Sequence, residues 1–172
     1  MQGIGSYGTD YIFVKNGRVY KVPQIGGNET EITSGVAIFD TSARIRLENA
    51  RGIISAQRYE LIYLADSSGN NNPYYYNGTT LTEMTVFNSA ILGITFTKPV
   101  GMLNWLDRLI WFFHSSSEYK NYILASDLDD GNNYTATGGS DQAFFNEVYA
   151  GESQDYISGL KTTRDRDWET RI

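Results

Sequence analysis

Short apolar runs alternate with polar turns along the chain, and this spacing predicts β-strands. Residues 11–22 (YIFVKNGRVYKV) contain two apolar-rich runs that flank Asn16-Gly17, a pair that favours the positive φ angles of a tight hairpin turn. In residues 43–50 (ARIRLENA), apolar and charged residues alternate, as in a strand with one buried face. Both patterns predict antiparallel hairpins.

Strand-length runs continue to the end of the chain. Two of them, within residues 74–87, flank a second Asn-Gly pair at Asn77-Gly78. Only residues 88–92 are compatible with a single helical turn. The further runs are residues 36–40, 52–56, 60–66, 91–97, 100–106, 108–113, 122–128, 143–149 and 156–160.

Two of these segments match each other as an internal repeat. The apolar run at residues 61–64 (LIYL) matches residues 109–112 (LIWF) at an offset of 48 residues, and at this offset residues 74–76 fall on 122–124. A period of about 45–50 residues with about four short strands is the blade period of a β-propeller. Each blade buries both faces against its neighbours, which explains runs that do not alternate.

The sequence therefore predicts an all-β fold of antiparallel, β-propeller-like blades, with about two to three blades of an incomplete propeller. One partial domain is expected over residues 1–166, in units of about 8–51, 52–100 and 101–160. Residues 167–172 (DWETRI) are charged where the repeat requires an apolar strand, so they are interpreted as non-native. The alternatives are a solvated tail and a small open or oligomeric β-structure.

Composition narrows the class of function. The chain has 172 residues, 41% apolar and 14% aromatic, which excludes a disordered protein and allows one sizeable core. A net charge of -6 argues against a nucleic-acid partner. The absence of cysteine excludes disulfides and thiolate metal sites. No apolar run approaches the roughly 18 residues of a membrane span, so no membrane insertion is expected.

Candidate catalytic and metal sites are weak. The single histidine, His114, follows an apolar strand and has no G-x-S-x-G nucleophile motif to serve, so it is interpreted as a strand-end residue. The densest acidic cluster has Asp127, Asp129 and Asp130 with Asn132, but it lacks the spacing of a calcium-binding EF-hand and resembles a solvated turn. Carboxylate pairs for glycoside hydrolysis cannot be placed from spacing. We predict no catalytic residue, metal or cofactor.

The remaining candidates are loop residues that could contact a partner. Loop tyrosines can stack on sugars or dock a second chain, whereas the aromatic residues of the apolar runs are expected in the core. The predicted interaction loops contain Tyr119, Asp127, Asp129, Asp130, Asn132 and Tyr134.

The run DRLIWFF…YILASDLDDGNNYTATGG…QDYISGL resembles the propeller repeat of many tailed-phage structural proteins. There, an Asp-Arg-Leu strand is followed by a strand ending in Ser-Asp, an acidic loop and an Ile-x-Gly-Leu segment. The matching positions are Asp107, Arg108, Leu109, Ser126, Asp127, Asp129, Asp130, Gly131, Asn132, Tyr134, Ile157, Gly159 and Leu160. The Tyr-rich segment with Asn-Gly-Thr-Thr-Leu at residues 77–81 resembles a second repeat of the same proteins. The acidic loop lacks their usual proline, and the expected last strand is missing.

This resemblance implies a virion component of a bacteriophage, of the tail-hub, nozzle or fibre-associated type. Such a protein would be a non-catalytic, rigid scaffold for interactions with other virion proteins, in an oligomeric assembly formed in the host cytoplasm. Two alternatives of other classes remain open. One is a module that recognises a cell-surface glycan, and the other is a propeller enzyme that cleaves polysaccharide.

Overall fold

The computed structural model describes residues 1–84, 98–114, 117–134, 142–148, 157–161, 163–164 and 170–171. Over these residues the regular structure consists of strands, and no helix occurs among them. The predicted all-β class is therefore confirmed. The run at residues 91–97, the helical turn at 88–92 and most of the tail at 167–172 lie outside the described residues.

Twelve of the strands form three four-stranded antiparallel sheets, each in simple sequential order. A short pair, β13 and β14, follows them. The first sheet contains β1 (Gly3–Tyr7), β2 (Asp10–Lys15), β3 (Arg18–Pro23) and β4 (Thr30–Glu31); the second β5 (Ile45–Ile54), β6 (Gln57–Asp66), β7 (Tyr74–Tyr76) and β8 (Leu81–Glu83); the third β9 (Pro99–Trp105), β10 (Arg108–Phe113), β11 (Tyr122–Ala125) and β12 (Phe144–Glu147); the pair is Thr163–Arg164 and Thr170–Arg171.

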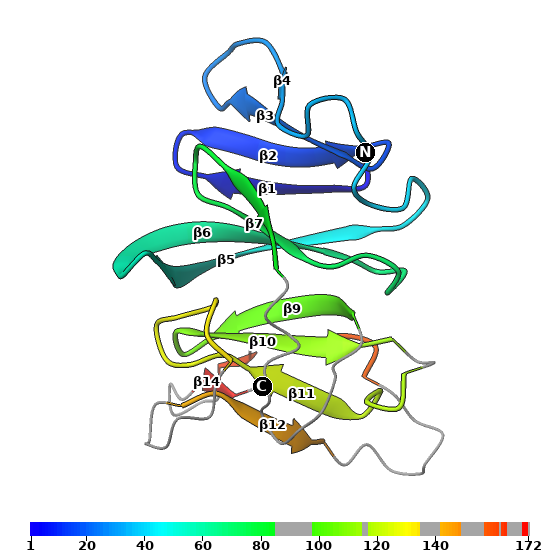
Figure 1. The fold of residues 1–172 in the computed structure, drawn as a ribbon, viewed down its shortest axis with the longest axis vertical. Coiled ribbons are helices and arrows are strands. Elements are labelled where there is room, and N and C mark those ends of the chain that lie inside the picture. The colour runs from blue at the N-terminus through cyan, green and yellow to red at the C-terminus, as the bar shows by residue number, and fades with distance from the viewer. Residues whose placement is uncertain are drawn as a thin grey trace.

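The three sheets follow one another along the long axis of the molecule, with β4 near one end and β12 near the other (Figure 1). The first strands of successive sheets are neighbours, because β1 contacts β5 and β5 contacts β9. Among the described residues no sheet closes on itself.

The predicted tight turn at Asn16-Gly17 is confirmed. Asn16 and Gly17 have φ angles of 53° and 72°, and the flanking residues Lys15 and Arg18 pair directly. At Asn77-Gly78 the strands are joined by a longer loop, since Tyr76 pairs with Leu81. The Asn77 carboxamide oxygen accepts hydrogen bonds from the backbone N–H groups of residues 79 and 80, which shapes this loop.

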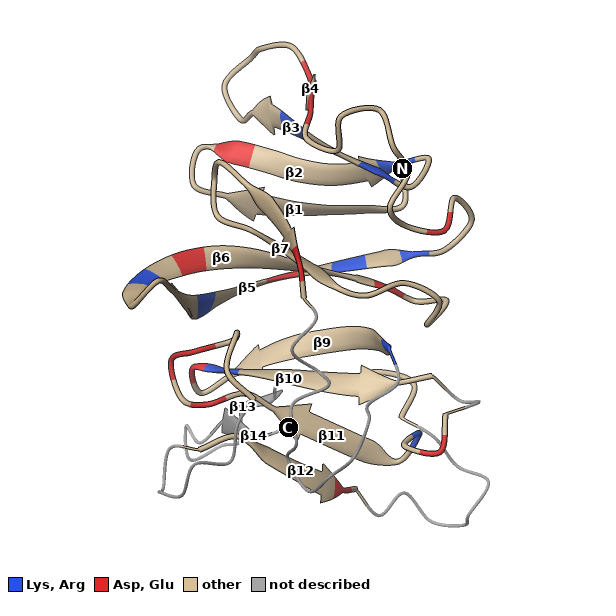
Figure 2. Ribbon diagram, viewed as in Figure 1, with Lys and Arg blue, Asp and Glu red and all other residues tan. Residues whose placement is uncertain are grey.

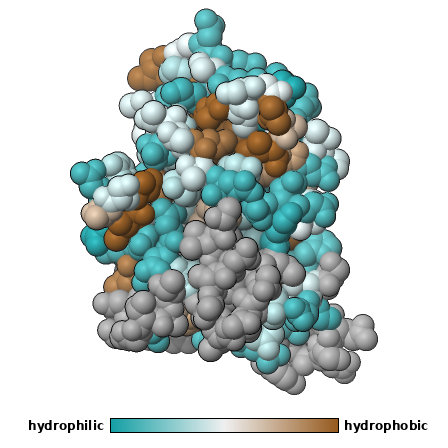
Figure 3. All heavy atoms as spheres, viewed as in Figure 1, coloured by the Kyte–Doolittle hydropathy of each residue, from teal (hydrophilic) through white to brown (hydrophobic). Residues whose placement is uncertain are grey.

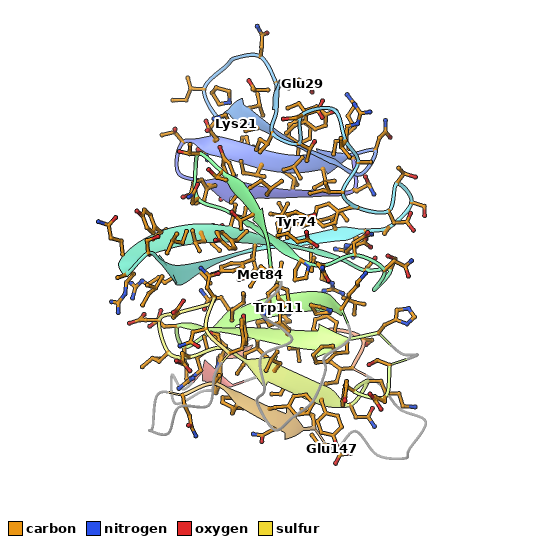
Figure 4. All side chains as sticks on the ribbon, in the orientation of Figure 1. Lys21, Glu29, Tyr74, Met84, Trp111 and Glu147 are labelled. Carbon is orange, nitrogen blue, oxygen red and sulfur yellow. The ribbon has the colours of Figure 1, made fainter. Side chains whose placement is uncertain are left out.

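Two apolar layers separate the three sheets. Ile12, Val14 and Val19 of the first sheet pack against Ile62 and Leu64 of the second. The opposite face of the second sheet packs against the third, and Figure 4 shows Met84 and Trp111 in this region. Every residue of β6 from 61 to 66 is buried, because both faces of this strand are covered. For the runs at residues 60–66 and 108–113, this confirms the interpretation as core strands.

Residues that match each other in the internal repeat do not occupy equivalent positions in the structure. At the offset of 48, Leu61 and Leu109 should occupy the same face of successive sheets. Instead, both belong to the layer between the second and third sheets, where the rings of Tyr63 and Trp111 meet at 6.4 Å. Side chains alternate with a period of two, so a one-residue difference in register reverses the face. The offset of 48 is therefore wrong as a structural equivalence for the middle strands.

Strand boundaries also differ from the apolar runs. Residues 36–40 form no strand, although Phe39 is buried in the layer between the first two sheets. The Ile38 and Phe39 backbone N–H groups both donate to the Gly17 carbonyl, so hydrogen bonds attach this segment to the first hairpin turn. The runs at 43–50 and 52–56 belong largely to one ten-residue strand, β5, which crosses the predicted boundary between units at residues 51 and 52.

Candidate functional site

The candidate interaction residues gather in the acidic loop, which we define as residues 127–134 after β11. This loop lies against the end of the β5–β6 hairpin, residues 51–60, which we call the hairpin end. Figure 2 shows basic and acidic segments together at the hairpin end and on the loop beneath it. The site is thus a junction between the second and third sheets.

The acidic loop is shaped by its own backbone and side chains. Asp127 and Asp130 form an isolated bridge, and the Asp127 N–H donates to the Asn133 carbonyl at 2.9 Å. The Asp127 carboxylate accepts hydrogen bonds from the Asn133 side chain and the Ala143 N–H. Its pKa is raised, mainly because burial disfavours the charged form. Asp129 has a φ of 59°, a left-handed conformation that Asp tolerates in turns.

Hydrogen bonds join the loop to the backbone of β5. The Asp130 Oδ1 atom accepts from the Ile53 N–H at 2.9 Å and from the Asn132 N–H at 3.1 Å. The Gly131 N–H donates to the Arg51 carbonyl at 2.7 Å. The Asn132 carboxamide donates to the Ile53 carbonyl at 3.3 Å. The loop therefore binds the free edge of β5 much as a neighbouring strand would.

Ion pairs surround these backbone contacts. The Arg51 guanidinium lies 2.9 Å from Asp129, 3.2 Å from Glu60 and 3.9 Å from Asp107. Arg58 lies 3.5 Å from Asp129. The hydrogen bonds to Asp129 and Glu60 raise the pKa of Arg51. These groups are partly exposed, so each pair adds little stability alone.

A double-mutant cycle with Arg51→Met and Asp129→Asn is expected to show a coupling energy of about 0.2–1 kcal/mol, the range of exposed pairs. The coupling should fall as salt is added, because salt screens exposed charges. Urea unfolding of the wild type, both single variants and the double variant measures it. The matched control is a second cycle that combines Arg51→Met with Glu29→Gln. Glu29 pairs with Lys15 in the first sheet, away from Arg51, so the effects of these two changes should be additive.

Tyr134, a predicted interaction residue, lies in the core. Its side chain is fully buried, and its hydroxyl accepts from the Trp111 indole N–H at 2.5 Å and donates to the Gly131 carbonyl at 2.7 Å. Burial raises its pKa. The Tyr63 hydroxyl, from the facing sheet, donates to Asn132 at 3.1 Å. Both tyrosines anchor the underside of the acidic loop, with their rings away from solvent.

Tyr119 belongs to a separate aromatic cluster on the third sheet. Its ring contacts Phe113 at 6.2 Å, Tyr122 at 5.9 Å and Phe145 at 5.6 Å, in edge-to-face arrangements. It does not join the acidic loop. The six predicted interaction residues therefore divide into one cluster at the sheet junction and one residue packed elsewhere.

Sequence reasoning missed the residues on the other side of the junction. A Cβ atom on Gly52 would lie 2.6 Å from the Tyr63 hydroxyl, and one on Gly131 would lie 2.5 Å from it. Both positions therefore require glycine so that the loop and the hairpin end can close around this hydroxyl. Gly52, Tyr63 and Arg51 carry no local motif, and only the fold brings them to the loop.

The other chemical candidates are dispersed. Among the described residues, no group of three His, Asp or Glu side chains could hold a metal ion. His114 directly follows β10, in accord with its interpretation as a strand-end residue. Asp66, the last residue of β6, is fully buried. No described helix is long and apolar enough to cross a membrane.

A hollow of about 490 Å³ runs along the first strands of the three sheets. Arg44, Arg46 and Glu48 of the second sheet line it, together with apolar side chains such as Met102 and Leu160. Burial raises the pKa of Glu48, and a hydrogen bond from the Asn104 backbone opposes this shift. Burial also lowers the pKa of Arg46. The hollow is therefore polar but partly desolvated.

Replacing Glu48 by Gln is expected to stabilise the protein at pH 7. Because the folded-state pKa of Glu48 is raised, the wild type gains stability as the pH falls through that pKa towards the ordinary value of 4.5. The advantage of Gln should therefore be largest at neutral pH and vanish below about pH 4.5. Urea midpoints between pH 4 and 8 measure it. Glu29→Gln, which breaks the exposed pair with Lys15, should instead lower stability at pH 7.

Comparison with known proteins adds no relative: no protein-family model, curated protein or solved structure shows a significant match to this chain. The residues and the geometry of the chain are therefore the evidence on which its function is argued.

Proposed function

We propose that this chain is a non-catalytic scaffold of β-propeller type, part of the tail of a bacteriophage particle. The observation that carries the proposal is the succession of three four-stranded antiparallel sheets with neighbouring first strands β1, β5 and β9. A propeller arranges its blades in this way around an axis, and the hollow along these strands lies where the axial channel of a propeller would begin.

The chemistry of the acidic loop supports a structural function. Its carboxylates bind Arg51, Arg58 and backbone N–H groups of the second sheet, so they stabilise the sheet junction. A catalytic carboxylate needs access to a substrate and a proton-transfer partner in a cleft. The described carboxylates of this loop instead bind groups of the neighbouring sheet. Phage identity rests on the resemblance of residues 107–134 and 157–160 to tailed-phage repeats.

The proposal is tested on particles purified from the source that encodes the chain. Peptide mass spectrometry should detect the chain in these particles in fixed ratio to a capsid protein. The genes that flank its coding sequence should encode other virion proteins. A chain absent from particles and flanked by metabolic genes would overturn the proposal.

Binding of the purified protein to a glycan array distinguishes the scaffold function from a receptor-binding function. The scaffold should show no saturable binding to any glycan. Saturable binding that disappears in a variant of a surface loop would favour the glycan-recognition alternative, and release of reducing sugar from a polysaccharide would favour the enzyme.

A further inference from the structure

The hollow of about 490 Å³ along the first strands of the sheets is lined by two neighbouring arginine residues, Arg44 and Arg46. Arg44 directly precedes β5, and its carbonyl accepts from the Ser67 N–H, which continues the strand pairing. Side chains two residues apart on a strand lie on the same face. Ile45, between the two arginines, is buried on the opposite face, in the layer with the first sheet. Figure 2 shows these basic segments at the start of β5.

The positive charge of these two arginines is not neutralised within the described part of the chain. Neither Arg44 nor Arg46 forms an ion pair with a described Asp or Glu residue. Glu48 lies on the same face of β5, but its carboxylate accepts a hydrogen bond from the Asn104 backbone instead. Burial lowers the pKa of Arg46, and the charge of Arg44 lowers it further. A bound anion would relieve this repulsion.

Arg46 is held in place by residues of the third sheet and the segment after it. Its guanidinium lies over the Phe112 ring at 5.1 Å and donates to the Ser158 carbonyl at 3.4 Å. A Cβ atom on Gly101 would lie 2.7 Å from the Arg46 side chain, so glycine leaves the space that this side chain occupies. A guanidinium has five N–H donors, and the Ser158 contact uses one of them. An ordered side chain with spare donors loses little entropy on binding a ligand.

We propose that Arg44 and Arg46 bind the carboxylate group of an organic ligand in this hollow. A guanidinium fits a carboxylate through two parallel N–H···O hydrogen bonds. The apolar side chains of Met102, Leu103 and Leu160 line the same hollow and suit a short aliphatic chain behind the carboxylate. Glu48 on the same face disfavours a more highly charged anion such as phosphate. Free organic acids and the glutamate side chains of other proteins both present this chemical group.

The lining of the hollow differs from the surface drawn in Figure 3. There, apolar patches and hydrophilic side chains occupy largely separate areas. In the hollow, charged and apolar side chains face the same concave space, which is typical of sites for small ligands. The inference goes beyond the scaffold function and does not rest on it. Absence of carboxylate binding would leave the scaffold proposal unchanged.

Titration of the full chain with butyrate, followed by two-dimensional ¹H–¹⁵N NMR, tests the site. Saturable shifts are expected at the amides of residues 44–48 and 101–103, with a dissociation constant on the order of 1 mM for so small a ligand. Butyramide, which has nearly the same shape but no charge, should not bind. Inorganic phosphate should bind more weakly than butyrate.

A glutamate residue blocked at both ends distinguishes the two sources of the carboxylate. If it shifts the same amides with an affinity similar to that of butyrate, the hollow accepts an acidic side chain of a partner protein. If butyrate binds and the blocked residue does not, the site is restricted to free organic acids. Either result supports carboxylate binding and identifies the class of ligand.

Substitutions test the residues of the site. Arg44→Met and Arg46→Met keep an aliphatic side chain but remove the donors, so each should weaken butyrate binding about tenfold. Glu48→Gln removes a negative charge from the same face and should strengthen binding about threefold at pH 7. The matched control Arg58→Met makes the same change in charge at the hairpin end, and it should bind butyrate as the wild type does.

Three results would overturn the inference. The first is a wild-type protein without saturable shifts, and the second is butyramide or phosphate binding as tightly as butyrate. The third is unchanged butyrate binding in Arg44→Met, whose exposed position makes misfolding an unsuitable explanation. Glu48→Gln provides a gain of affinity that does not depend on the folding of Arg46→Met. Weaker binding in Glu48→Gln would contradict positive charge as the determinant of binding.

Discussion

Trp111→Ala should lower the free energy of unfolding by about 3–5 kcal/mol, the usual cost of truncating a fully buried aromatic residue. Trp111 is fully buried between the second and third sheets and meets Tyr63 edge to face. Its indole N–H also donates to the Tyr134 hydroxyl at 2.5 Å. The truncation therefore opens a cavity and removes a donor from a buried hydroxyl. Urea unfolding followed by circular dichroism measures the loss.

Trp111→Phe separates the two contributions. The phenyl ring keeps most of the packing against Tyr63 but donates no hydrogen bond to Tyr134, so we expect a loss of about 1–2 kcal/mol. If Trp111→Ala destabilised the protein by less than 1 kcal/mol, the packed junction between the second and third sheets would be wrong. Equal losses in the two variants would indicate that the hydrogen bond, and not packing, holds the junction.

Local features of the fold could be predicted from the sequence because their physical causes are local. The Asn16-Gly17 turn is favoured by residues that tolerate positive φ, and the two flanking strands pair without help from the rest of the chain. Residues 61–65 and 109–113 are apolar on both faces, and this pattern predicted strands covered on two sides. The repeat period predicted about two to three blades, and the described residues contain three four-stranded sheets.

The face of the sheet on which each side chain lies could not be predicted from the same patterns. Apolar runs without alternation carry no record of which side chain points to which neighbour. Leu61 and Leu109 are equivalent in the alignment, yet they meet in one layer of the core. In a strand, a shift of one residue exchanges the two faces, and only the pairing of complete sheets decides the register.

The site illustrates a different limit. The acidic loop was recognised as a turn from its Asp, Asn and Gly content, which is a local property. Its partners, Arg51 and Ile53, lie 78 and 77 residues away from the loop residues that they bind. No pattern within the loop indicates that its carboxylates are satisfied by a neighbouring sheet. The burial of Tyr134 was not predicted for the same reason, since its partner Trp111 lies outside the loop, on β10.

Asp66→Ala is the second change with a large expected effect. Asp66 is fully buried at the end of β6, yet its carboxylate is well satisfied. The Oδ2 atom accepts from the Asp40 N–H at 2.8 Å and from the Asn71 side chain at 2.7 Å, and the Oδ1 atom accepts from the Ser68 N–H at 2.7 Å. Truncation leaves three donors without this acceptor. We expect a loss of about 2–4 kcal/mol, because unsatisfied donors cost about 1–3 kcal/mol each when water cannot reach them fully.

Asp66→Asn tests whether the acceptor geometry causes this loss. An amide offers one oxygen and one donor, so it can replace only one side of the carboxylate and should recover part of the stability. The control Glu147→Ala, at an exposed position of β12, should change stability by less than about 0.5 kcal/mol. Hydrogen exchange locates the effect: in Asp66→Ala the amides of Asp40 and Ser68 should exchange faster than those of β2. If exchange at Asp40 were unchanged, Asp66 would not be the residue that attaches the segment between the first and second sheets to the core.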